Sequence, residues 1–177
     1  KATNDNELSL PVVSVDGNKS IYMAFRNDLG DVTFTNSDTS TSTTINKLSG
    51  NEDDIVLTKI DRSGKLLWSA SIGFSGTSDG VFDSLDIDTD DCGCVYLTAS
   101  YTHNNLQFGD FEGVFNSDFD LTQTNNDAIN AFLVKYNADG RPIWVVKAAP
   151  DSINGDLVNL RVSVDQCSEV QWVGNLG

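Results

Sequence analysis

The sequence predicts an all-β domain built from repeated antiparallel strands. Apolar residues alternate with polar ones or form short blocks bounded by glycine, asparagine and aspartate. No stretch keeps the 3.6-residue period of an amphipathic helix over three turns. The stretches 36–54 (Ser/Thr-rich) and 115–130 (Asn/Asp-rich) are predicted to be long surface loops. In chain order the predicted strands are 12–16, 21–26, 31–34, 55–61, 66–72, 85–89, 95–100, 106–108, 131–137, 142–148, 160–165 and 170–174.

Charge and composition exclude several classes of protein. Of the 177 residues, 26 are Asp or Glu and 11 are Lys or Arg, giving a formal net charge of -15. Binding to nucleic acid or to an anionic lipid surface needs a basic face, so neither is predicted as a partner. No apolar run reaches the roughly 18–20 residues of a membrane span. A hydrophobic content of 39% is too high for a disordered acidic tail and predicts a folded domain.

The predicted strands recur along the chain. Segment 55–68 matches segment 131–144, and segment 13–22 recurs at 87–96 and 162–171. The matched positions in the first pair, each 76 residues apart, are Lys59 and Lys135, Gly64 and Gly140, and Trp68 and Trp144. A period this long predicts an antiparallel β-repeat domain that is propeller-blade-like or sandwich-like. The predicted organisation is an N-terminal extension, 1–11, and a single domain, 12–177, with repeats 12–84 and 85–158 and a partial repeat 159–177.

Turn residues and tryptophans give each repeat its predicted structure. Segments 61–64 and 137–140 are predicted to be tight turns, in which Gly64 and Gly140 supply a positive φ angle. Residues 16–18 are predicted to form a similar turn between the first two strands. Trp68 and Trp144 follow their turns at equivalent positions, which favours a role as core anchors over ligand stacking.

At this level of detail the chain resembles a known family. Segments 54–68, 72–76 and 86–98 resemble the bacterial β-propeller repeat family, the seven-bladed propeller-type repeat. The Cys92-Gly-Cys94 segment and the low number of repeats depart from that pattern. The resemblance implies an extracellular or cell-surface bacterial protein with a structural or binding role. It carries over no catalytic residue, so no enzyme activity is predicted, and the leader that export requires is expected to have been removed.

The low repeat number suggests self-assembly. A propeller needs about four blades to close, and two and a half repeats fall short of that. Leu8, Leu10 and Val12 alternate in a segment that could act as a donor strand for a neighbouring copy. Val170 and Trp172, in the last predicted hairpin, would lie at the edge that receives it. The sequence thus predicts a homopolymer, either a fibre or a ring, although the first strand could instead fold back within its own chain.

Two other functions fit the same residues. The chain could be a monomeric extracellular adhesion or carbohydrate-binding module that uses its long loops to bind glycans. It could also be an accessory domain of a larger propeller enzyme, which would require further Lys–Gly–Trp repeats in a longer chain.

The remaining candidate sites are local patterns. Asp86, Asp88 and Asp90 project from one face of a strand, which favours a solvated acidic face and makes Ca²⁺ the one candidate metal. The cysteines leave room for one disulfide, with Cys94 and Cys167 as a candidate pair and Cys92 an alternative to Cys94. The candidate glycosylation sites are Asn18, Ser84 and Ser152.

Overall fold

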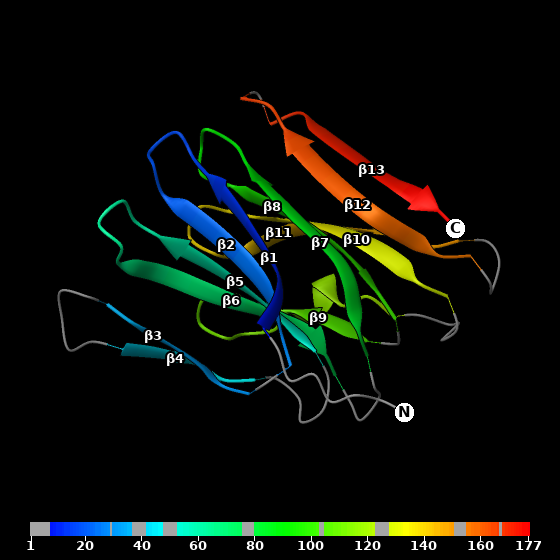
Figure 1. Ribbon diagram of the computed structural model, residues 1–177, viewed down its shortest axis with the longest axis horizontal. Helices are drawn as coiled ribbons and strands as arrows, with labels where there is room; N and C mark the ends of the chain where they lie inside the picture. The colour runs from blue at the N-terminus through cyan, green and yellow to red at the C-terminus, as the bar shows by residue number, and fades with distance from the viewer. Residues whose placement is uncertain are drawn as a thin grey trace.

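The fold is a row of antiparallel β-sheets, seen here in a computed structural model (Figure 1). The structure describes residues 8–28, 30–36, 42–47, 53–75, 80–102, 105–122, 128–150, 155–166 and 168–177. These residues include no α-helix, only the short 3-10 helix η1 (Ser117–Phe119). The strands are β1 (Leu8–Val15), β2 (Ile21–Asn27), β3 (Val32–Thr35), β4 (Ser42–Ile45), β5 (Asp54–Ile60), β6 (Leu66–Phe74), β7 (Phe82–Thr89), β8 (Val95–Tyr101), β9 (Leu106–Phe108), β10 (Asn130–Tyr136), β11 (Pro142–Ala148), β12 (Leu157–Val164) and β13 (Val170–Leu176).

The strands form two full units and one half unit. The first unit is the meander β1-β2-β5-β6, to whose outer edge β9 adds a fifth strand. The second unit is the meander β7-β8-β10-β11. The half unit is the hairpin β12-β13, and the hairpin β3-β4 is a separate two-stranded sheet. The predicted all-β fold of antiparallel sheets, blade-like or sandwich-like, is therefore confirmed.

The two full units agree in register as well as in strand order. Lys59 pairs with Trp68 between β5 and β6, and Lys135 pairs with Trp144 between β10 and β11. Both ladders shift immediately after the lysine, where a bulge leads into the turn. The sequence match thus corresponds to the same local structure formed twice.

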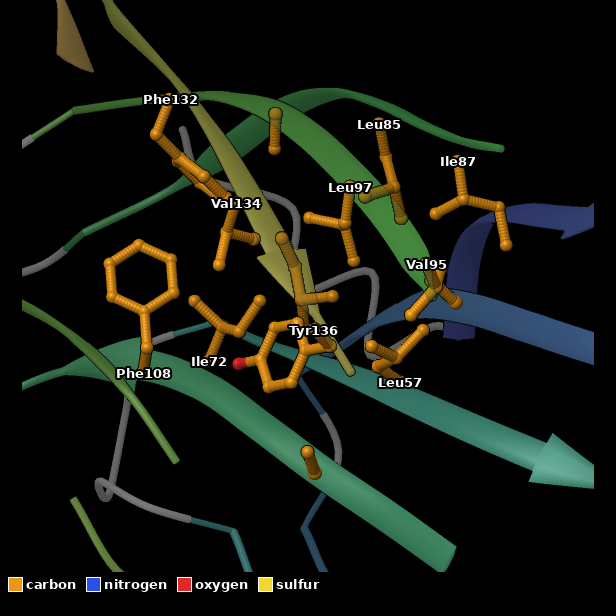
Figure 2. Packing of buried hydrophobic residues seen from close by; sticks show 14 of the residues in the cluster. Leu57, Ile72, Leu85, Ile87, Val95, Leu97, Phe108, Phe132, Val134 and Tyr136 are labelled. Carbon is orange, nitrogen blue, oxygen red and sulfur yellow. The ribbon is translucent and has the colours of Figure 1, made fainter. Parts of the chain in front are cut away.

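The units lie side by side with their first strands adjacent. β7 contacts β1 on one side and β12 on the other, so these three strands form the inner row of the molecule (Figure 1). The main core lies between the two full sheets. Figure 2 shows Leu57, Ile72 and Phe108 of the first sheet directed towards Phe132 and Tyr136 of the second.

Six turns share one geometry. In each, a side-chain oxygen of Asp or Asn accepts a hydrogen bond from the backbone amide four residues later, and the residue three positions later has a left-handed φ. The turns begin at Asp16, Asp61, Asp90, Asp110, Asn137 and Asp165, and the left-handed residues are Lys19, Gly64, Gly93, Gly113, Gly140 and Ser168. The turn at 16–18 was predicted to obtain its positive φ from glycine, but Lys19 adopts it, at 66°.

Two sequence-based boundaries are wrong. Residues 42–45, predicted as loop, form β4, where Thr44 pairs with Thr33 of β3 across an antiparallel ladder. Serine and threonine suggested a loop by their polarity, although β-branched threonine is also a good strand former. Residues 8–11, predicted as an extension outside the domain, belong to β1, because Leu8 and Ser9 pair with Asn27 and Arg26 of β2.

Candidate functional site

One face of the first sheet points away from the second sheet, and we call it the first open face. Only one half of this face is covered. The hairpin β3-β4 packs Val32 and Phe34 against Phe25 and Val56, and so covers the part near β5. Over β1 and the start of β2 the same face is bare, leaving Val13 60% and Val15 52% exposed. Val13 and Val15 pair with Met23 and Ile21 across the β1–β2 ladder, which places all four on this face.

The far face of the second sheet, the second open face, is covered over its opposite half. There the half unit packs Val162 and Trp172 against Tyr96 and Leu133, near the inner strands. Trp172 Nε1 also donates a hydrogen bond to Thr98 Oγ1 at 2.8 Å. The outer strand β11 is covered only at Trp144, which packs against the same cluster. Val146, which pairs with Leu133, is 49% exposed, and on the outward side of β13 Val173 is 61% exposed.

Contacts inside the molecule show how a complete junction between units is built. Tyr22 Oη donates to the Gly93 carbonyl oxygen at 2.7 Å, and the Tyr22 ring stands edge-on to Trp68. Trp68 Nε1 and Lys59 Nζ both donate to the carbonyl oxygen of Ala138, at 2.9 and 3.2 Å. The first unit is therefore fastened to two turns of the second, one between its inner strands and one between its outer strands.

The second unit repeats only half of this junction. Ser168 replaces Gly93 at the inner turn, and its hydroxyl donates to Asp90 Oδ2 at 2.8 Å. Tyr96 donates to the same oxygen at 3.2 Å, and Lys135 lies 3.7 Å from it. Within the described part of the chain, Trp144 Nε1 has no acceptor, because β12-β13 lacks the outer turn on which it would rest.

Electrostatics favour an ionised Asp90 at this junction. Burial opposes the charge, but hydrogen bonds from the Ser168 hydroxyl and the Cys94 amide outweigh it and hold the pKa of the Asp90 carboxyl below its ordinary value. Burial raises the pKa of the neighbouring Cys94 thiol, and the negative charge of Asp90 adds to that effect. Asp90 thus pairs with Lys135 inside the second unit and accepts the Ser168 hydroxyl from the half unit.

The predicted calcium carboxylates do not form a metal cluster or a solvated acidic face. Asp86 Oδ2 accepts the backbone amide of Val162 at 3.0 Å, and Asp88 Oδ2 accepts that of Val164 at 2.9 Å. No group of three potential ligands converges anywhere in the described ranges. Asp86 and Asp88 thus serve as acceptors for backbone amides of the neighbouring strand β12, a role that the expected solvated acidic face did not include, and the calcium candidate stays a prediction.

The predicted assembly residues lie in different places. Leu8 and Leu10 belong to β1, paired within their own chain, and Val12 packs against the main core. The side chains of Val170 and Trp172 pack against the second sheet, while the outer backbone edge of their strand, β13, has no ladder partner within the described residues. Of the predicted anchors, Trp68 is buried in the main core and Trp144 is half-buried at the second open face. Alternation alone could not show which side of each strand its own chain would cover.

The modification sites differ in accessibility. Asn18 is exposed in the turn after β1, whereas Ser84 is half-buried and its hydroxyl lies 2.8 Å from that of Ser100. Cys94 is a free thiol here, and both Cys167 and Ser152 lie outside the described residues. The disulfide and the three glycan sites stay predictions.

Comparisons with known proteins add no family assignment. No protein-family model matches the chain, and no curated protein matches it in sequence. The residues that the structure describes contain no helix long and apolar enough to cross a membrane.

Proposed function

We propose that this chain is a structural protein that assembles head to tail with copies of itself, through its two open faces, into a fibre or a surface layer. The observation that carries the proposal is that the two open faces are covered in opposite halves. The first is bare over β1 and the start of β2 and covered over the rest of β2 and β5, whereas the second is covered over β8 and part of β10 and largely bare over β11. Each face therefore carries a covering hairpin where the other face is bare.

The contact between copies would continue a contact that the chain already makes. β1 lies against β7 and β7 against β12, so a second copy that places its β1 against β12 extends the same row. That placement would bury Val13 and Val15, and covering a valine fully contributes about 1.5 kcal/mol or more. Because the two faces differ, the contact is heterologous, and such contacts build rings or filaments.

The proposed mode differs from simple donation of the N-terminal strand. β1 is already paired along one edge with β2, so it is not free to leave its own sheet without breaking that ladder. Association of the faces leaves every observed ladder intact.

The proposed site of action is outside the cell or on a bacterial cell surface. Support comes from the acidic, serine-, threonine- and asparagine-rich composition and from the resemblance to propeller-type repeats. The proposal includes no catalysis, nucleic acid or membrane insertion, and glycans are its one possible addition. Fractionation of the source cells, with detection by an antibody, tests the location.

Two complementary variants test the assembly. Val15→Glu damages the first open face, and Val146→Glu damages the second. Each variant alone should be monomeric by light scattering, whereas an equimolar mixture should form a dimer through the two undamaged faces. Val114→Glu, at an exposed valine outside both faces, is the matched control and should assemble like the unmodified chain.

The outcomes are distinct. The unmodified chain should form species of high mass that negative-stain microscopy resolves as filaments or sheets. A chain that stays monomeric at every concentration would overturn the proposal, and saturable glycan binding by that monomer would favour the adhesion module instead. Circular dichroism of each variant should match that of the unmodified chain and so separate loss of assembly from loss of folding.

A further inference from the structure

We infer that the hairpin β3-β4 of one copy pairs with β13 of another, completing the half unit as a four-stranded sheet shared between two chains. This inference rests on the proposed function and names the strands that carry it. The half unit contributes the inner strands β12 and β13, and the hairpin contributes the outer two. β3 and β13 would form a new antiparallel ladder.

The hairpin runs in the required direction. β3 starts beside the end of β2, where Asn27 Nδ2 donates to the carbonyl oxygen of Gly30, and Asn27 itself pairs with Asp54 at the start of β5. Near the other end, Asn36 Oδ1 accepts the amide of Leu66, the first residue of β6. β3 therefore runs parallel to β5, as the third strand of a preceding unit must.

The hairpin β3-β4 also packs in the way that the third and fourth strands of a unit pack. Val32 and Phe34 cover Phe25 and Val56 of the first unit. In the complete junction, Ile55 and Leu57 of the first unit pack in one core cluster with Phe132 of the second. In both cases a third strand directs its side chains onto the next unit.

In the second unit, a segment inserted between two strands pairs with the unit that precedes it in the chain. Both units insert a segment between their second and third strands, residues 28–53 in the first and 102–129 in the second. In the second unit this segment supplies β9, which pairs with β6 of the unit before it through Ile72 and Phe108. β3-β4 comes from the corresponding insertion of the first unit, and the position before that unit is the one that another copy's half unit would occupy. The difference is that β9 adds to the fourth strand of a full sheet, whereas β3 would add to the second strand of a half sheet.

The shared sheet would also complete the unfinished junction around Trp144. Trp68 rests on the turn between the third and fourth strands of the next unit. In a shared sheet, the end of the hairpin that carries Thr35 and Ser42 would lie beside Trp144 as the 137–140 turn lies beside Trp68. The edges that would pair, on β3 and on β13, have no ladder partner within the described residues.

A shared sheet makes the contact between copies heterologous. Repetition of that contact would give a ring, or a filament if each junction carries an axial offset.

Cysteine cross-linking tests the ladder directly. In a background with the natural cysteines replaced by serine, Val173→Cys is placed on one copy and either Val32→Cys or Phe34→Cys on another. These side chains would share one side of the β3–β13 ladder, because Val173 points away from the second sheet and Val32 and Phe34 point onto the first. Mild oxidation of the mixture should give a disulfide-linked dimer with one of the two β3 positions.

The control mixture pairs Val114→Cys with Val173→Cys and should give no dimer. Hydrogen exchange supplies a second readout, because backbone amides of β3 and β13 should become protected when the chain assembles. Assembly without the cross-link and without that protection would overturn the shared sheet but leave the proposed function standing. A monomer would overturn both, and a cross-linked, discrete dimer would confirm the shared sheet while excluding the fibre.

Discussion

The indole of Trp68 and the carbonyl oxygen of Ala138, 70 positions apart in the chain, form a 2.9 Å hydrogen bond that joins the two full units. Trp144 occupies the equivalent place in the second repeat, and its Nε1 meets no acceptor within the described residues. The same residue in the same register is thus a core anchor in one unit and an open contact in the next.

That asymmetry predicts unequal costs for one substitution. Trp68→Phe should lower the free energy of unfolding by about 1–3 kcal/mol, because the indole is buried and its Nε1–H donates a hydrogen bond to the Ala138 carbonyl oxygen. Trp144→Phe should cost the monomer less, because Trp144 is only half-buried and its Nε1 has no acceptor within the described residues, but it should weaken assembly. Urea denaturation and light scattering measure the two effects, and equal losses of stability would contradict the distinction.

A second pair of variants separates backbone strain from packing. Gly64 and Gly140 both have left-handed φ angles, 88° and 79°. Alanine at either position should cost about 1–2 kcal/mol for that conformation. A Cβ at Gly140 would also lie 2.8 Å from Trp68 Cδ2, whereas at Gly64 nothing lies within 4 Å. Gly140→Ala should therefore be more destabilising than Gly64→Ala by at least about 1 kcal/mol, measured by urea denaturation.

The acceptor role of Asp86 and Asp88 can be read from hydrogen exchange. Replacing both by alanine should leave the amides of Val162 and Val164 without partners and speed their exchange. Asp83→Ala, at an exposed position on the same strand, is the control and should leave that exchange unchanged. Adding a chelator should have no effect. Exchange that depended on Ca²⁺ would show instead that these carboxylates bind metal.

The lowered pKa of Asp90 predicts how the stability of the second junction depends on pH. A carboxyl whose pKa is lower when folded stabilises the protein above its unfolded pKa, and this contribution fades as the pH falls through the folded value. The stability gap between the unmodified chain and Asp90→Asn should thus be full at neutral pH and shrink below about pH 4. The midpoints of urea denaturation across the pH range measure this gap in stability. A gap that widened in acid would show that the pKa of Asp90 is raised, not lowered, in the folded protein.

Salt should promote assembly. Copies that each carry a net charge of -15 repel one another, while the contacts proposed between them are largely apolar. Screening shortens the range of that repulsion from about 30 Å at 0.01 M salt to about 10 Å at 0.1 M. Light scattering at fixed protein concentration should therefore increase over this range, and disassembly by salt would point to ion pairs as the main contact.

The amino-acid sequence by itself determined the strands, the turns and the repeat. Alternation, Asx–glycine turns and the recurrence of the Lys–Gly–Trp pattern are local signals, because strand pleat and turn geometry depend on residues close together in the chain. Local pattern also misjudged β4, whose polar threonines form a strand because Ile45 meets Val32 and packs over Phe25.

Only the tertiary structure decided which faces are covered. Val12 and Val13, or Trp172 and Val173, are neighbours of similar polarity, and the sequence could not show which side its own chain would bury. Nor could it show that Asp86 and Asp88 meet amides from a strand 76 residues away. Contacts between units depend on how whole sheets stack, and that information is spread over many residues far apart in the chain.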